Sequence, residues 1–179
     1  MSYSTSRNSY RVGPYRSFIE FKWALAFDWL RIYYEYEPRC YKLPDGRKYL
    51  PDFYVVTTQD DKYKEYFCEV KQKATPDELK KCWELSIMLN IPVIVLEKYP
   101  SLTRCFKGFE NGQPKFYYFN GVDFEETKSE SPRKTNTNSN VGKIIHTIKE
   151  GEVIEHIRST MNRPYNQTPA WHDWTDSHV

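Results

Sequence analysis

Three charged residues in the segment 50–73 are placed so that they could act together on a ligand. Asp52 follows a proline inside an apolar run, and Glu69 and Lys71 lie on either side of a valine in the next apolar run. Carboxylates are rare in such runs unless another group compensates for their charge. Because side chains alternate between the two faces of a strand, we expect Glu69 and Lys71 to share one face, while Val70 points into the core.

The two carboxylates can meet if the strands that carry them are paired. Asp52 and Glu69 then repel each other strongly unless one is protonated or a cation lies between them. Oxygen ligands favour a hard cation such as Mg²⁺, which needs few protein ligands and keeps several waters. Lys71 would stand beside a metal-bound water, where it could orient the water or stabilise charge on a scissile phosphate. The alternative is a surface ion pair between Glu69 and Lys71 or Lys73, which contributes little and leaves Asp52 unexplained.

The order Pro51-Asp52, then Glu69-Val70-Lys71, resembles the signature of the PD-(D/E)XK nuclease superfamily. The resemblance covers roughly residues 16–97, and the chain is similar to compact phage or transposon-type endonucleases and Holliday-junction resolvases. Gln72-Lys73 stands where many members have a glycine after the lysine. The following helix lacks the Gln-x-x-x-Tyr pattern of processive exonucleases, so the resemblance does not imply exonuclease action.

This resemblance implies a metal-dependent endodeoxyribonuclease that uses Mg²⁺, with Mn²⁺ able to substitute. Asp52 and Glu69 would bind the metal, the carbonyl of Val70 would be a backbone ligand, and Lys71 would be the catalytic lysine. Family members often carry an acidic residue on the helix that precedes the core sheet. Glu20 stands at that place and would contribute a third carboxylate through water.

DNA is the expected partner, and four basic residues are candidate contacts to its phosphates. Arg11 and Arg16 belong to an N-terminal segment that contains arginines and tyrosines but no acidic residue. A frayed, solvated terminus explains that segment equally well. Lys73 shares the face of Lys71, and Lys80 lies on the following helix. Most helix lysines are simply solvated, so these two assignments also have an ordinary alternative.

The composition indicates one ordinary domain with a small appendage. The chain has 179 residues, a formal net charge of +2 and 17% aromatic residues, so charge alone does not indicate nucleic-acid binding. The four cysteines and four histidines show neither CxxC pairs nor zinc-ligand spacing, so we do not expect a structural zinc site. No signal peptide and no long apolar run is present, so we expect no membrane association. The expected location is the cytoplasm, of a bacterial host if the protein is phage-encoded.

Several elements must position the candidate residues. A helix with apolar residues around most of its circumference is expected at 16–30. Strands are expected at 33–37, 40–43, 47–56, 66–71 and 93–96, with a turn at Pro44-Asp45-Gly46 and a polar loop at 57–62. Thr75 to Glu78 forms a capping box with proline at the first helical position, and that helix should end at Asn90. A strand, a helix and a strand of this length predict a parallel pair.

The remaining chain predicts a hairpin and a helical extension. Strands at 105–109 and 115–119 flank Asn111-Gly112, a strong hairpin signal. We divide the chain into a flexible basic arm at 1–15, a nuclease-like core at 16–124, a polar linker at 125–142, and a C-terminal helix (about 143–161) with a tail that reaches 179. The predicted fold is α/β, with a restriction-endonuclease-like core whose central mixed β-sheet is flanked by helices, plus this C-terminal helical appendage.

Two questions of assembly stay open at this point. Cutting both strands of a duplex with one site per chain usually takes two copies, and the apolar stripe of the C-terminal helix offers a surface for a homodimer. The stripe could equally cover its own core.

The linker and the extra helix also exceed the needs of the core. They motivate an alternative function, that of a non-catalytic DNA- or protein-binding protein on the same fold, such as an inhibitor or an assembly subunit.

Overall fold

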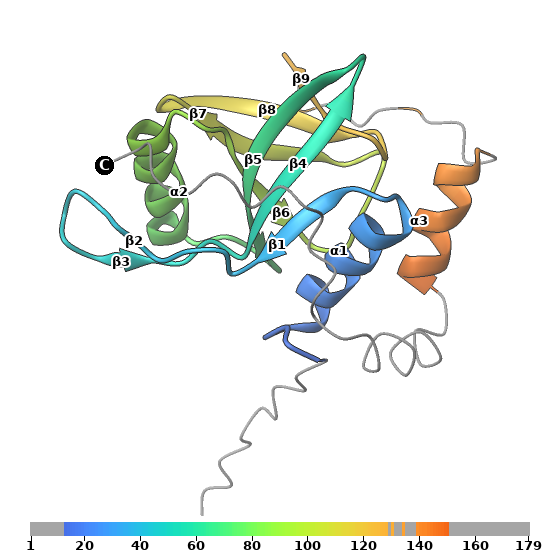
Figure 1. The fold of residues 1–179 in the computed structure, drawn as a ribbon, viewed down its shortest axis with the longest axis horizontal. Coiled ribbons are helices and arrows are strands. Elements are labelled where there is room, and N and C mark those ends of the chain that lie inside the picture. The colour runs from blue at the N-terminus through green and yellow to red at the C-terminus, as the bar shows by residue number, and fades with distance from the viewer. Residues whose placement is uncertain (1–12, 129, 131–133, 135–138, 151–179) are drawn as a thin grey trace, which may run out of the picture.

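A large mixed sheet with helices on both faces forms the centre of the protein. The computed structural model describes residues 13–128, 130, 134 and 139–150. This part of the chain contains a curled seven-stranded sheet in the order β1-β4-β5-β6-β7-β8-β9, a two-stranded ribbon β2-β3 and three helices (Figure 1). The α/β class predicted from the sequence is confirmed. None of the helices in the described part is long and apolar enough to cross a membrane.

The elements have the following bounds: α1 Phe18–Trp29, β1 Tyr33–Tyr36, β2 Tyr41–Lys42, β3 Lys48–Tyr49, β4 Phe53–Gln59, β5 Lys62–Lys71, α2 Pro76–Leu89, β6 Val93–Glu97, β7 Cys105–Glu110, β8 Gln113–Phe119, β9 Phe124–Thr127 and α3 Asn140–Glu150. The only parallel pair within the described sheet joins β5 to β6, as predicted, while the other neighbours are antiparallel. Helix α2 makes the crossover. Its capping box at Thr75 and Glu78 and its end at the left-handed Asn90 (φ 53°) also agree with the prediction.

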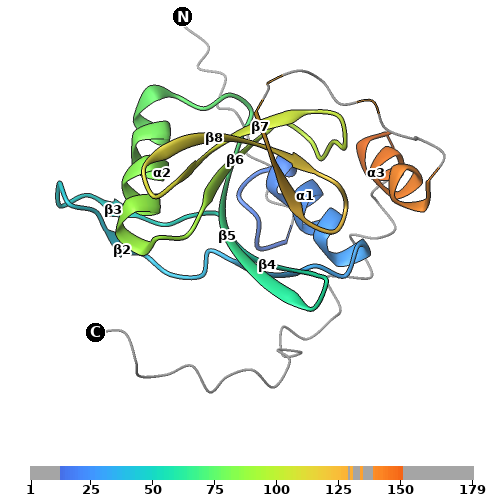
Figure 2. The ribbon, with the colours of Figure 1, turned by 90° about the horizontal axis from the view of Figure 1, so that it is seen from above.

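The two faces of the sheet carry separate cores (Figure 2). Helices α1 and α3 cover one face, where Trp23 and Phe27 of α1 pack on Phe53 and other side chains of the sheet. Helix α2 and the β2-β3 ribbon cover the other face around Phe67 and Leu85. Strand β5 is therefore buried on both faces from Tyr66 to Val70. The face of Glu69 and Lys71, which we expected to lie opposite the core, faces a second core.

The predicted strand at 47–56 is divided in two. Strand β3 ends at Tyr49 and β4 begins at Phe53. Pro51 lacks an N–H and cannot continue the ladder of hydrogen bonds. In the gap, the Asp52 carboxylate accepts a hydrogen bond from the backbone N–H of Val70 (2.7 Å) and thus replaces a ladder partner of β5.

The polar loop predicted at 57–62 is wrong, because this segment is the tip of a long hairpin. Strands β4 and β5 stay paired up to Gln59 and Lys62. Asp60 and Asp61 form a two-residue turn with positive φ angles of 51° and 59°, a conformation that aspartate tolerates and that hairpin twist favours. The hairpin predicted around Asn111 is confirmed.

The segment after the expected core boundary contributes to the fold as well. Strand β9 extends into the predicted linker and pairs with β8, and α3 begins at Asn140 rather than near Lys143. Ile145 and Ile148 of α3 are buried against the core that contains α1. Residues 151–161 of the predicted helix, the tail and most of the N-terminal arm lie outside the described residues.

Candidate active site

The structure brings Asp52, Glu69 and Lys71 together at the carboxyl end of β5. Phe53 of β4 is in register with Cys68 of β5, and the two strands are antiparallel. Asp52, the residue before Phe53, therefore lies opposite Glu69, the residue after Cys68. The Lys71 Nζ lies 2.8 Å from Glu69 Oε1 and 3.6 Å from Asp52 Oδ2. A break at a proline on one strand and an alternating pattern on the next thus place two carboxylates and one ammonium at a single point.

Asp52 is almost completely buried, with 5% of its surface exposed. Burial raises the pKa of Asp52 to about 7, and the negative charges of Glu69 and Glu20 act in the same direction, against the opposing effects of Lys71 and the Val70 N–H. When the pKa of an aspartate lies near neutrality, its surroundings destabilise the ionised carboxylate, because they do not supply enough positive charge for it. This is the pattern typical of functional sites.

Within the described residues, Lys71 is the one cation held between these two carboxylates. Burial lowers the pKa of Lys71, but the charges of Asp52 and Glu69 outweigh it and hold the pKa above its ordinary value. Glu78, in the first turn of α2, adds a third carboxylate 3.9 Å from the ammonium. Lys71 is therefore protonated at neutral pH, and it acts as a charged donor rather than as a base.

Glu20 lies in the first turn of α1 and is also buried. The Ser17 hydroxyl donates to its Oε1 (2.9 Å), and the Tyr36 hydroxyl (2.7 Å) and the Arg16 N–H (3.0 Å) donate to its Oε2. Its charge contributes to the raised pKa of Asp52. Because both of its oxygens already have donors, Glu20 suits the indirect role predicted for it, through water and through its charge, better than direct ligation.

Tyr49 is a site residue that the sequence reasoning missed. Its buried hydroxyl donates to Glu69 Oε2 (2.7 Å) and lies 3.4 Å from Cys82 Sγ. Burial raises the pKa of Tyr49 well above its ordinary value, so the phenol stays a donor. The one available signal was its place at the end of a short strand before Pro51-Asp52, and that signal does not reveal its partner.

The donor set fits a hard divalent cation, although it is small. In the described part of the chain no group of three or more His, Cys, Asp or Glu side chains is placed to hold a metal ion. Asp52 and Glu69 form a pair, and Mg²⁺ is commonly held by one or two carboxylates with several waters. The Val70 N–H points to Asp52, and the two polar groups of one strand residue point to the same side. The Val70 carbonyl therefore faces the Asp52 side as well.

The four predicted phosphate contacts differ in their surroundings. The Arg16 guanidinium forms an ion pair with Glu37, and Lys80 lies 3.6 Å from Glu84 in α2. Lys73 is exposed and forms no ion pair within the part of the chain that the structure describes. Arg11 lies outside the described residues. Of the three residues that the structure describes, only Lys73 therefore presents a charge without an ion-pair partner, two positions after Lys71.

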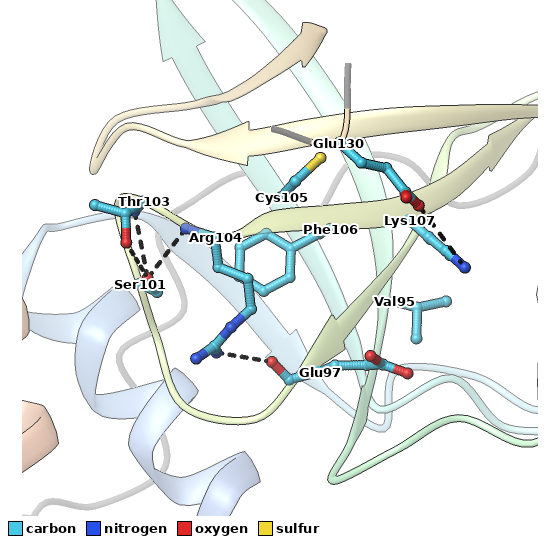
Figure 3. Close-up of a pocket in the computed structure, with 9 residues that line it drawn as sticks. All are labelled: Val95, Glu97, Ser101, Thr103, Arg104, Cys105, Phe106, Lys107 and Glu130. Atoms are coloured by element: carbon cyan, nitrogen blue, oxygen red, sulfur yellow. Dashed lines mark hydrogen bonds and ion pairs between the residues drawn. The ribbon is translucent and has the colours of Figure 1, made fainter. Parts of the chain in front are cut away.

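A hollow of about 490 Å³ lies across β6 from the candidate site (Figure 3). Glu69 of β5 is in register with Val95 of β6, and Val95 with Lys107 of β7, so these three side chains form one row on the same face. The Arg104 guanidinium at the rim donates to the backbone carbonyls of Glu97 (3.0 Å) and Tyr99 (2.8 Å). The hollow is lined by two basic and two acidic side chains, and one of its basic groups, Lys107, lies 3.8 Å from the Glu130 carboxylate.

No family model, curated protein or solved structure matches the chain.

Proposed function

We propose that the protein is a Mg²⁺-dependent endodeoxyribonuclease with a restriction-endonuclease-like core, and that it hydrolyses DNA phosphodiester bonds at Asp52, Glu69 and Lys71. One observation carries the proposal: the Lys71 ammonium contacts two buried carboxylates that lie opposite each other on paired strands. Their order along the chain is that of the PD-(D/E)XK signature.

The energetics of this cluster favour a functional site over a structural ion pair. Burying two carboxylates side by side is costly, and a single ammonium does not offset the cost. The raised pKa of Asp52 expresses the remaining deficit of positive charge. A cation bound between Asp52 and Glu69 would remove that deficit.

Each side chain has a distinct role in the proposed reaction. Mg²⁺, when bound, would polarise a phosphate oxygen and lower the pKa of a water molecule. Asp52 and Glu69 would hold the ion, and Glu69 Oε1 could donate a lone pair to it only if Lys71 gave up its contact with that oxygen. The ammonium of Lys71 then remains in the site to orient the attacking water and to stabilise charge that develops on the phosphate.

The test is cleavage of supercoiled plasmid, linear duplex, single-stranded and branched DNA with Mg²⁺, with Mn²⁺ and with EDTA. We expect nicking or cutting with either metal and none with EDTA. The variant Asp52→Asn, purified in parallel, controls for contaminating nucleases and should not cut. If none of these substrates is cut, the proposal is overturned. Isothermal titration then identifies the non-catalytic alternative, because an intact site should bind Mn²⁺ and a purely structural one should not.

A further inference from the structure

The β2-β3 ribbon, residues 41–49, has two chemically different faces. Tyr41 is in register with Tyr49, and Lys42 with Lys48. Tyr49 and Leu43 are buried in the core under α2, and Tyr41 packs against Phe67 of that core. Because side chains alternate along a strand, the two lysines point to the opposite face, and both are exposed. Figures 1 and 2 show the ribbon beside α2 and extending beyond it.

The ribbon is held in place by its inward face. Arg47 binds Asp45 in the turn (2.6 Å) and Asp77 at the start of α2 (2.5 Å). Tyr49 binds Glu69 in the candidate site. These bonds attach both the tip and the base of the ribbon to the body of the protein, and they also occupy the neighbouring carboxylates.

The outward face carries charge that the folded protein does not compensate. Lys42 and Lys48 lie directly opposite each other, an arrangement of like charges that destabilises a strand pair. Among the residues that the structure describes, neither of these two lysines has a carboxylate partner. Local arrangements that destabilise the fold, and that no other interaction compensates, are expected at functional surfaces.

We infer that this outward face, formed by Lys42 and Lys48, binds the phosphate backbone of duplex DNA beside the candidate active site. The inference rests on the proposed nuclease function and assigns it a contact surface. Lys48 and Asp52 are separated by a chain segment that spans at most about 14 Å, which corresponds to about four base pairs. A duplex held at Asp52 therefore extends past the ribbon. A two-stranded ribbon also has the width that a major groove admits.

The experiment measures binding of a fluorescent DNA duplex in EDTA over a series of salt concentrations. The variant is Lys42→Ala/Lys48→Ala, and the control is Lys128→Ala/Lys143→Ala, which removes the same charge from exposed lysines at the end of β9 and on α3. If both ribbon lysines contact phosphates, the slope of log affinity against log salt should fall in magnitude by about 1.8, at about 0.9 per lost contact. The weakening should be the same for unrelated duplex sequences. Thermal unfolding of the ribbon variant should show no loss of stability, because it removes a repulsion.

Each remaining outcome overturns the inference. An unchanged slope in the ribbon variant, with normal binding by the unsubstituted protein, excludes these lysines as phosphate contacts. An equal loss in the control shows an effect of net charge alone. Absence of binding by the unsubstituted protein excludes the surface altogether. Cleavage by the unsubstituted protein is scored separately, so the proposed function can stand while the inference about the ribbon fails.

Discussion

The Tyr49 hydroxyl holds Oε2 of Glu69 at 2.7 Å, while Oε1 of the same carboxylate contacts Lys71 at 2.8 Å. One oxygen is thereby fixed inside the core under α2, and the other is presented to the candidate site. The orientation of Glu69 depends on a tyrosine from a ribbon outside the main sheet. The ribbon, the proposed metal ligand Glu69 and the proposed catalytic lysine Lys71 are therefore coupled through one carboxylate.

Tyr49→Phe should weaken metal binding without removing a metal ligand. The substitution leaves Glu69 Oε2 without its donor, which costs about 1–3 kcal/mol of folding stability. Loss of such an outer contact lowers metal affinity or activity by about ten- to a hundredfold. Titration with Mn²⁺ measures the change in metal affinity, and cleavage at saturating metal measures the change in activity. Tyr54→Phe is the matched control, because it removes a tyrosine–glutamate contact with the exposed Glu65.

Lys71→Ala should slow the chemical step and spare metal affinity. The ammonium acts on the water and the phosphate in the transition state, so its loss should reduce the single-turnover rate by about a hundred- to a thousandfold. Affinity for Mn²⁺ should hold or rise, since the ammonium no longer competes for Glu69 Oε1. A rate equal to that of the unsubstituted protein would remove Lys71 from the mechanism. Lys128→Ala, at an exposed lysine after β9, controls for loss of one positive charge.

Asp52→Asn should abolish Mg²⁺ binding. The amide keeps the shape of the side chain, and its oxygen can still accept the bond from the Val70 N–H. It loses the charge that holds a hard cation. DNA binding in EDTA should tighten, because one carboxylate no longer repels the phosphates. Retention of metal binding and of the normal cutting rate would show that the chemistry takes place elsewhere.

The same variant should change how stability depends on pH. The pKa of Asp52 is raised from 3.8 to about 7 in the folded state, so the folded protein binds more protons than the unfolded chain between these values. The stabilising contribution of protonated Asp52 is complete below about pH 4 and is lost as pH rises through about 7. Thermal unfolding in EDTA at pH 5 to 8 should therefore show that the stability of Asp52→Asn, relative to that of the unsubstituted protein, increases as pH rises. Asp60→Asn, in the exposed β4-β5 turn, should follow the unsubstituted protein.

Metal affinity should itself depend on pH, because Asp52 must lose its proton to act as a ligand. With its pKa at about 7, apparent Mn²⁺ affinity should fall below pH 7, by up to about tenfold per pH unit, and level off above it. Calorimetric titrations at pH 6, 7 and 8 would show this. A flat profile would mean that no proton is displaced and that Asp52 is not a ligand.

Local signals in the sequence determined much of the architecture. The capping box at Thr75 and the left-handed stop at Asn90 define α2 without help from other elements. Its length then requires β5 and β6 to be parallel, and the turn at Asn111 specifies the hairpin β7-β8. The approach of Asp52 to Glu69 followed from strand alternation and pairing alone, because the side-chain period of a strand is two.

Other features depended on contacts between residues far apart in the chain, and no local pattern encodes those. The tight turn at Asp60 looked like part of a polar loop, since the strands beside it are exposed at their tips. Burial of Glu69 on its own face required α2 and the ribbon to cover that face. The hydrogen bond from Tyr49 to Glu69 exists only after that covering layer forms. The sequence thus determined which residues meet at the site, while the tertiary structure decided how deeply they are buried and which donors hold them, since burial depends on what packs over a strand.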